Sequence, residues 1–470
     1  MKLVKYISNI VIVMGLGLML NVNLTQAQIP TKQDLIQEKE EQINTVEDTS
    51  LNKLTNKVNI KSAILNWPEI PNAVMYELLV KDVNTEEILF KKYNIYAAGY
   101  QLDNSEVDLN KNLKWQVRGL DENKVPVSDY TKPRLLQKGD VYNINWQSKG
   151  DGYNLEPFTK HNFNTVLVKN DVNISPLKIT THFDKMKYMP VYPVYSWVPV
   201  KNINHYNIDI YYLPKYDFNN ITKVASYKAP QGMDYYDDKA YLQEGLYFFN
   251  VQAIDNNNQK VAESKNIYFT VKTKNIDVAA LGDSITHGGG AVSTPPSATL
   301  YNWETYTDIP VLNIGFSGNL TSDMANRFDR DVLAFNPKIL IIMGGVNDIR
   351  TGITANTVIN NLNIIKQKCQ KHNIIPVFLT VTPVNPERMK NVIHLDISPG
   401  WDKERLKINE WIKTQPHYID SAQALTNEQG LLLDNMTTDG LHPDYEGKKH
   451  IGEMVETYLK ANFMQILSQK

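Results

Sequence analysis

The stretch AALGDSITHGGG, residues 279–290, decides how the C-terminal part of this chain folds. It begins as a short apolar run typical of a buried strand, passes through Gly282 and Asp283 to Ser284, and continues into a cluster of glycines. Glycine lets a backbone turn sharply and approach a ligand closely. A hydroxyl group at the corner where a strand ends is well placed to attack a carbonyl, so Ser284 is a candidate nucleophile.

Around this stretch, from residue 274 onward, short aliphatic runs alternate with amphipathic stretches. This alternation predicts a parallel sheet with helices on its faces, and a last helix follows Pro443. We therefore expect a three-layer, flavodoxin-like α/β domain over 274–470. The predicted strands are 276–281, 310–315, 338–345, 374–383 and 417–420, and the other predicted helices are 321–335, 355–372 and 402–413.

A serine nucleophile needs a base, and TTDGLHPDYEG at 437–447 offers one just before the last predicted helix. Asp439 and His442 stand three residues apart there. A histidine can take the serine proton, while a carboxylate on its other ring nitrogen holds the tautomer and stabilises the imidazolium. A turn-forming aspartate beside a surface histidine would give the same sequence, so the pair indicates a catalytic site only in combination with Ser284.

The reaction also needs hydrogen-bond donors for the oxyanion. NIGFSGN at 313–319 places Gly315 and Gly318 directly after a predicted strand, and IMGGVND at 342–348 places Asn347 after the next one. Backbone amides and a side-chain amide can donate to a developing oxyanion. Because ligand sites in open parallel sheets lie at the carboxyl ends of the strands, we expect these segments to meet.

These four segments resemble the SGNH hydrolases, also called GDSL-like esterases and lipases, over about residues 274–465. The motifs are GDSIT at 282–286, NIGFSG at 313–318, GVND at 345–348 and DGLH at 439–442. The resemblance implies a carboxylic ester hydrolase. Its implied roles are Ser284 as nucleophile, His442 as general base, Asp439 as orienting acid, and the Ser284 amide, the Gly318 amide and the Asn347 side chain as oxyanion donors. Such acyl transfer requires no metal and no organic cofactor.

Other polar and aromatic residues near the motifs have two interpretations. Trp303, Glu304 and Trp401 either line the substrate pocket or pack in the core. His287 has no carboxylate three residues away, so it is expected to be a loop or pocket-wall residue rather than the base. Ser317 lies in GFSGN, outside any Gly-x-Ser-x-Gly motif, and is expected to shape the oxyanion loop. Asp283 and Asp348 are expected to brace turns by accepting hydrogen bonds from backbone amides.

An internal repeat precedes the hydrolase-like region. Trp67 and Tyr76 are nine residues apart, as are Trp197 and Tyr206, and each pair is followed by an alternating apolar strand. Further on, LKWQVRGLDENK at 113–124 matches YFFNVQAIDNNNQ at 247–259. The pattern resembles fibronectin type III β-sandwiches over 57–140 and 186–273, and we interpret 141–185 as a connecting segment.

Composition limits the remaining choices. The chain has 470 residues with 51 acidic against 49 basic side chains, so no excess charge draws it to nucleic acid. Its length predicts several domains. The single cysteine, Cys369, excludes an intramolecular disulfide, and its helical spacing from Val358, Leu362 and Ile365 indicates a buried apolar residue rather than a reactive thiol.

The N-terminus has the three parts of a secretory signal: Lys2 and Lys5, the apolar run 10–20, and TQAQ at 25–28. We expect a signal peptide over 1–27 cleaved after Ala27, then a polar linker over 28–56. No lipid-anchoring cysteine is present near the cleavage site, and no later stretch approaches the roughly 20 apolar residues of a transmembrane helix. A secreted or periplasmic protein without a transmembrane anchor is therefore expected.

The loops beside the motifs, 287–304 and 382–391, are polar or rich in glycine and proline. This favours a short acyl group, acetate above all, over a long lipid chain. Export and appended β-modules suit an acylated glycan, with polysaccharide contacts by the modules. A lysophospholipase or thioesterase is the enzymatic alternative, and a glycan-binding or adhesion protein with an inactive hydrolase domain is the alternative of another class.

Overall fold

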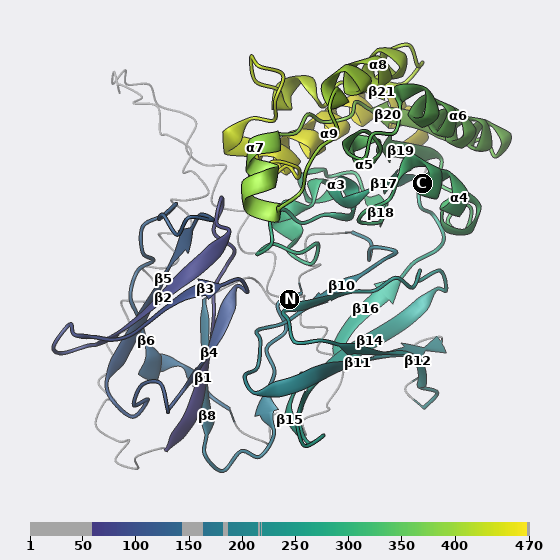
Figure 1. The fold of residues 1–470 in the computed structure, drawn as a ribbon. Coiled ribbons are helices and arrows are strands. Elements are labelled where there is room, and N and C mark those ends of the chain that lie inside the picture. Colours follow the sequence, from purple (N-terminus) through teal and green to yellow (C-terminus); the bar gives the residue numbers. More distant parts are fainter. Residues whose placement is uncertain (1–58, 143–162, 182–186, 215–216, 218, 468–470) are drawn as a thin grey trace, which may run out of the picture. The chain divides into compact units, whose positions relative to one another are not determined.

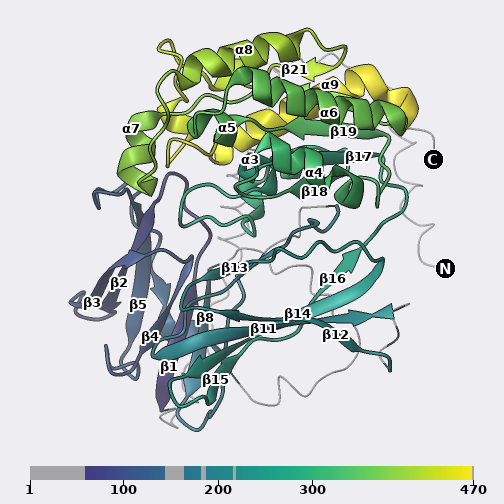
Figure 2. The ribbon, with the colours of Figure 1, turned by 45° about the vertical axis from the view of Figure 1, so that its right-hand side comes forward.

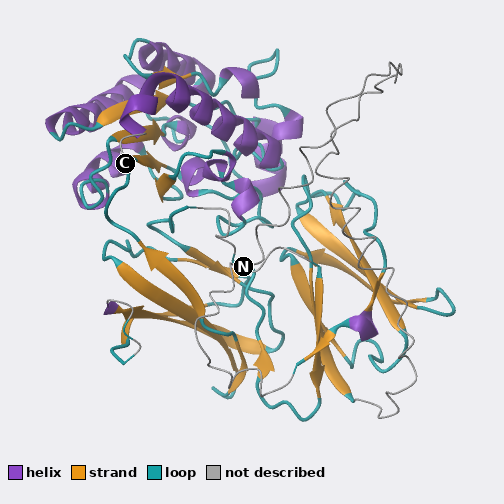
Figure 3. Ribbon diagram, turned by 180° about the vertical axis from the view of Figure 1, so that it is seen from behind, coloured by secondary structure: helices purple, strands orange, loops and turns teal. Residues whose placement is uncertain are grey.

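The computed structural model describes residues 59–142, 163–181, 187–214, 217 and 219–467 (Figure 1). The predicted signal peptide and polar linker lie outside these residues. Within the described ranges no helix is both long enough and apolar enough to cross a membrane. Figure 3 shows strands predominating before the hydrolase-like region and helices gathered within it.

The first β-domain consists of two four-stranded sheets whose apolar faces share one core. That core holds the tryptophan and tyrosine of the repeat, Trp67 and Tyr76, with ring centroids 5.5 Å apart and nearly perpendicular planes. One sheet has the order β4 (Gly99–Asp103), β1 (Ile60–Asn66), β8 (Asn164–Lys169), β7 (Asp140–Val141); the other has β3 (Ile88–Ile95), β2 (Met75–Asp82), β5 (Leu113–Leu120), β6 (Arg134–Leu135).

The second β-domain repeats the central pairing of the first. Its main sheet runs β12 (Thr222–Ala229), β11 (Ile203–Leu213), β14 (Gly245–Asp255), β15 (Lys260–Glu263), β9 (Ser175–Pro176), with β16 (Ile267–Val271) also on β14. A two-stranded sheet joins β10 (Val194–Ser196) to β13 (Asp234–Tyr236). Tyr76 lies opposite Gly119 and Tyr206 opposite Ala253, so the two copies found in the sequence share one register.

The interpretation of 141–185 as a connecting segment was wrong for its described parts. β8 pairs antiparallel with β1 and β7 pairs parallel with β8, so these strands complete a sheet of the first β-domain. β9 joins the sheet of the second. The sequence pattern did not show this because β8, with four buried residues in succession, carries no alternation that would match it to a partner sheet.

The C-terminal domain has the predicted flavodoxin-like architecture. Its five strands are all parallel, in the order β18 (Val311–Gly315), β17 (Val278–Gly282), β19 (Ile339–Met343), β20 (Ile375–Leu379), β21 (Tyr418–Ile419). This 2-1-3-4-5 order places β17 between β18 and β19. These three strands are fully buried, as expected for a parallel sheet covered on both faces.

Helices cover both faces of this sheet (Figure 2). α4 (Thr321–Asp331), α6 (Ala355–Lys371) and α8 (Trp401–Lys413) pack in succession, whereas α9 (Tyr445–Leu467) packs on the short helical turns at 299–306. The buried residues of α9 keep a helical spacing, which matches its predicted apolar stripe. Shorter helices follow strand ends: α3 (Ser284–His287), α5 (Val346–Arg350) and α7 (Pro386–Arg388).

A short segment before β10 belongs to the core of the C-terminal domain rather than to the second β-domain alone. Val191 and Tyr192 are buried among the core residues of the C-terminal domain. The Val191 amide donates to the carbonyl of Asn313 at 3.0 Å, and the Tyr192 hydroxyl donates to buried Asp331 at 2.6 Å. The predicted boundary at 273 therefore misses one contribution to the core of the C-terminal domain.

Candidate active site

Ser284 is the first residue of α3, directly after the corner that ends β17. Asp283 precedes the helix, and its carboxylate accepts a hydrogen bond from the Ile285 amide at 2.9 Å. Gly282 occupies the corner, where there is no room for a side chain: a Cβ there would overlap Thr286 Oγ1 and lie 2.6 Å from the carbonyl oxygen of Met343. The absence of a side chain at Gly282 therefore lets β17 end close to α3 and β19, and Ser284 is 9% exposed.

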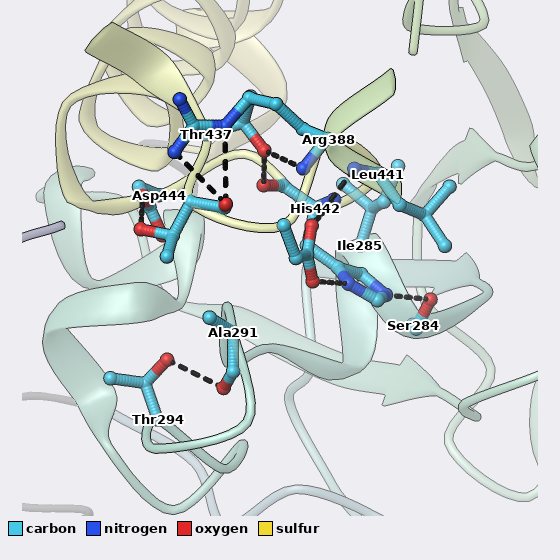
Figure 4. A network of polar contacts seen from close by, with 12 residues as sticks. Ser284, Ile285, Ala291, Thr294, Arg388, Thr437, Leu441, His442 and Asp444 are labelled. Atoms are coloured by element: carbon cyan, nitrogen blue, oxygen red, sulfur yellow. Dashed lines mark hydrogen bonds and ion pairs between the residues drawn. The ribbon is translucent and has the colours of Figure 1, made fainter. Parts of the chain in front are cut away.

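Figure 4 shows the His442 ring next to Ser284, and these two side chains form one hydrogen-bonded series with Asp439. His442 Nε2 lies 2.9 Å from Ser284 Oγ, and His442 Nδ1 lies 2.7 Å from Asp439 Oδ2. Ser284 and His442 are 158 residues apart in the sequence. The distances fit a hydroxyl, a base and an orienting carboxylate.

Asp439 is held as an anion despite its burial. Burial alone would raise its pKa, but the neighbouring charge of His442 and hydrogen bonds from the His442 ring and from the amides of His442 and Leu441 lower the pKa below its usual range. A carboxylate only accepts hydrogen bonds, so His442 Nδ1 carries a hydrogen and donates a hydrogen bond to Asp439. With its hydrogen on Nδ1, the ring directs the Nε2 lone pair at the Ser284 hydroxyl.

The loop that carries Asp439 and His442 is fixed by the segment around α7. Gly440 has φ +82°, and a Cβ there would overlap the carbonyl oxygen of Asn385. The Asn385 amide donates to the Gly440 carbonyl at 2.7 Å. The Arg388 guanidinium donates to the Thr438 carbonyl at 3.2 and 3.1 Å (Figure 4). These contacts tie 438–440 to the loop at 385–388.

The three predicted oxyanion donors follow strands that end at one level. Gly282 lies opposite Gly315 in β18 and opposite Met343 in β19. Asn347 is on α5 just after β19, and its side-chain amide donates to the carbonyl of Asn319, next to Gly318. Gly318 has φ +83°, and no atom lies within 4 Å of the position that a Cβ would take there, so the loop is open. Asn347 and the 316–319 loop are thus joined beside the nucleophile strand.

His287 is 3% exposed and is hydrogen-bonded to the oxyanion loop, so the structure favours the expected loop position over the pocket wall. The Ser317 amide donates to His287 Nδ1 at 3.2 Å, which leaves the hydrogen on Nε2, 2.7 Å from the Tyr192 carbonyl. Burial lowers the pKa of His287 to about 4, with Arg327 and Lys448 adding to the effect, so the ring is neutral. His287 connects the oxyanion loop to the segment before β10.

The other three candidates for the pocket lining, Trp303, Glu304 and Trp401, differ in burial and in surroundings. Trp303 is fully buried in the hydrolase core, packed where α9 crosses it at Gly452, and does not line a pocket. Glu304 is also buried, and burial raises its pKa to about 8. Trp401 is partly buried at the start of α8 and lies 5.9 Å from the Arg405 guanidinium. Trp303 and Trp401 thus make core or helix contacts, and Glu304 is buried near Lys448.

Lys448 is the residue that sequence reasoning missed. It is fully buried on α9, and its ammonium donates to the Ile285 carbonyl of α3 at 2.6 Å. Burial lowers its pKa to about 8, against the raising effect of Glu304 and Asp283. The sequence does indicate this burial, because Lys448 lies on the same helix face as Ile451, Val455 and Leu459, at spacings of three and four residues.

Several smaller predictions can be compared directly with the structure. Asp348 accepts hydrogen bonds from the Thr321 amide and hydroxyl, so it braces the start of α4 rather than its own turn. Ser317 lies in the oxyanion loop, and its Oγ is 2.9 Å from His287 Nδ1. Cys369 is fully buried, and burial raises its pKa to about 12, which suits the predicted apolar role. Within the described ranges, no three His, Cys, Asp or Glu side chains are grouped as metal ligands.

Residues 280–450 match the family described as GDSL-like Lipase/Acylhydrolase family, and they form a domain of this family of carboxylic ester hydrolases. An uncharacterized lipoprotein of Bacillus subtilis (strain 168) is 30% identical over 132 residues, covering 23% of this chain and 49% of the relative. The chain thus spans about half the length of that curated relative.

Solved structures are also similar over the same part of the chain. The lipase/acylhydrolase from Enterococcus faecalis is 23% identical, with a TM-score of 0.33, covering 40% of this chain and 96% of that one. A catalytic mutant of an acetylxylan esterase from Geobacillus stearothermophilus is 20% identical, with a TM-score of 0.30, covering 40% and 95%.

Proposed function

We propose that this protein is an exported serine esterase that removes short acyl groups, acetyl above all, from a carbohydrate. The observation that carries the proposal is the series from Ser284 Oγ through His442 to Asp439, with distances of 2.9 and 2.7 Å. Ser284 is the nucleophile, His442 the general base, and Asp439 the acid that orients it. The amides of Ser284 and Gly318 and the Asn347 side chain are the oxyanion donors.

The reaction proceeds by acyl transfer in two steps. Ser284 Oγ attacks the ester carbonyl while His442 Nε2 takes its proton, and the oxyanion of the tetrahedral intermediate is held by the three donors. The alcohol leaves with the proton from His442, which gives an acyl-enzyme. Water then attacks the acyl group with His442 as base, the acid is released, and Ser284 regains its proton.

A short acyl group is favoured by how firmly the loop after the nucleophile is held. Residues 288–298 are largely buried, and the Ser293 hydroxyl donates to the Ala73 carbonyl at 2.8 Å. Ser297 Oγ lies 2.7 Å from Ser196 Oγ. A lid that must move to admit a long chain would have fewer buried hydrogen bonds than this loop.

The carbohydrate part of the proposal depends on the polar loops, the predicted export signal and the two β-domains. Both β-domains bury a tryptophan against a tyrosine, and we infer that they are fibronectin type III-like modules. In this proposal the modules contact the polysaccharide, and the protein acts in the periplasm or outside the cell. A lysophospholipase or thioesterase activity of the same triad is the alternative.

The test is acetate release by the purified protein from 4-nitrophenyl acetate and from O-acetylated glycans, beside nitrophenyl esters of increasing chain length. We expect the rate to fall as the acyl chain lengthens and Ser284→Ala to abolish release while leaving the fold intact. Faster hydrolysis of long-chain esters or acyl thioesters would favour the alternative. A wild-type protein that binds glycans but releases no acyl group would instead be the inactive adhesion protein.

A further inference from the structure

A cleft of about 440 Å³ is lined in part by the oxyanion loop. Residues from three places line it: the oxyanion loop, helix α4, and the segments of the second β-domain around β10 and β13. A volume of this size suits a small ligand or a sugar unit. The lining residues are Tyr192, Asp238, Phe316, Asn319, Asp323, Asn326, Arg327 and Arg330.

The cleft and the proposed oxyanion hole share Asn319. Its carbonyl accepts from the Asn347 side chain, and its own side chain accepts from Arg327 Nε at 2.6 Å. Arg327 also donates to the carbonyl of Gly282, two residues before Ser284, at 2.9 Å. A ligand in the cleft would therefore lie directly beside the loop that faces the reacting ester.

The charges of the cleft are already compensated within the protein. Arg327 and Arg330 both form ion pairs with buried Asp331, and Arg330 also donates to the Tyr192 hydroxyl. Asp238 and Asp323 add two carboxylates to the lining. Together with Asp331, the carboxylates in and beside the cleft outnumber the two guanidinium groups, which disfavours an anionic ligand.

Four lining residues are exposed. Asp323 accepts a hydrogen bond from the Leu320 amide and Arg330 pairs with Asp331, whereas the other two have the chemistry to bind hydroxyl groups of a ligand. Asp238 follows β13 of the second β-domain, and Asn326 lies on the outer face of α4. A carboxylate accepts from hydroxyls, and an amide both donates and accepts. Phe316 is partly exposed and offers an apolar ring, a surface on which the C–H face of a sugar can pack.

We propose that this cleft is a subsite for an uncharged sugar unit of the substrate, bound by Asp238, Asn326 and Phe316 next to the unit whose ester is cleaved. The inference rests on the proposed function and adds to it a site built jointly by the second β-domain and the hydrolase domain. In this arrangement the β-domain is part of the substrate-binding surface rather than a separate anchor.

The experiment compares two kinds of ester in the full-length protein. One is 4-nitrophenyl acetate, which carries no sugar unit to occupy the cleft. The other is whichever O-acetylated oligosaccharide is cleaved fastest among neutral cello-, xylo- and chito-oligosaccharides. Asp238→Ala and Asn326→Ala should each lower kcat/KM for the oligosaccharide about tenfold, mainly through KM, because each removes a hydrogen bond to substrate. Both variants should keep kcat/KM for 4-nitrophenyl acetate within about twofold.

Matched controls use the same substitutions at exposed positions outside the lining, Asp308→Ala and Asn360→Ala, which should leave both activities unchanged. Melting temperatures show whether each variant is folded. The subsite would be overturned if the variants lost kcat/KM equally on both esters, or lost none on the oligosaccharide. It would also be overturned if the wild-type enzyme showed no higher kcat/KM for any neutral oligosaccharide than for 4-nitrophenyl acetate. A preference for O-acetylated oligogalacturonate would overturn its uncharged character. Failure of the wild type on every ester would instead refute the proposed function.

Discussion

At the scale of single residues, His287 is neutral in the folded protein because burial lowers its pKa from 6.5 to about 4. In the unfolded chain it takes up a proton near pH 6.5. Between pH 6.5 and 4 the unfolded state therefore binds more protons, and the folded state loses stability as the pH falls. The loss attributable to this group is about 3 kcal/mol when pH 4 is reached.

The variant His287→Gln isolates this effect, because glutamine does not titrate. We expect the variant to be less stable than wild type at pH 7, with a smaller further loss of unfolding free energy on going to pH 4. Urea unfolding at several pH values measures how the free energy of unfolding changes with pH in the wild type and in the variant. Parallel curves for the two proteins would mean that the ring is not the group that titrates.

Asp439 offers a second prediction at the residue scale. In Asp439→Asn the amide can donate to His442 Nδ1, which favours the tautomer with its hydrogen on Nε2 and removes the base from Ser284. We expect kcat to fall by about 10³ to 10⁴, with KM for 4-nitrophenyl acetate little changed. Steady-state kinetics measure both constants. Asp308→Asn, at a carboxylate whose side chain is 92% exposed, is the matched control and should keep full activity.

At the scale of elements, the close approach of α3 to β18 depends on Gly315. A Cβ at Gly315 would overlap the backbone nitrogen of His287 and lie 2.6 Å from its Cα, and backbone atoms cannot rotate away. We expect Gly315→Ala to destabilise the protein by about 3 kcal/mol or more and to lower esterase activity, since α3 carries Ser284.

The control for that substitution is Gly232→Ala, where no atom lies within 4 Å of the added methyl group. It should change the free energy of unfolding by less than about 0.5 kcal/mol. Chemical denaturation of both variants provides the comparison. Similar stability losses at the two positions would show that the contact between α3 and β18 is not tight.

At the scale of the whole molecule, the hydrolase core extends across the predicted domain boundary through Tyr192. Its hydroxyl donates to Asp331, which also binds Arg327 and Arg330. We expect Tyr192→Phe to lower the stability of the hydrolase domain by about 1–3 kcal/mol, because a buried carboxylate loses a hydrogen bond. The measurement is the temperature at which esterase activity is irreversibly lost. Tyr96→Phe, at a tyrosine 41% exposed in the first β-domain, should leave that temperature unchanged.

Sequence alone determined the order and type of the hydrolase elements and selected Ser284, Asp439, His442, Gly318 and Asn347, because these features depend on local periodicity and on motifs at strand ends. It also found the repeat of the β-domains, whose register the structure confirms. Only the tertiary structure decided that the triad atoms meet, that β8 and β9 belong to the β-domains, and that Trp303 and His287 are buried rather than lining a pocket. It also placed Lys448 under α3 and Tyr192 in the hydrolase core. Burial and long-range hydrogen bonds depend on partners distant in the chain, and local patterns do not specify those partners.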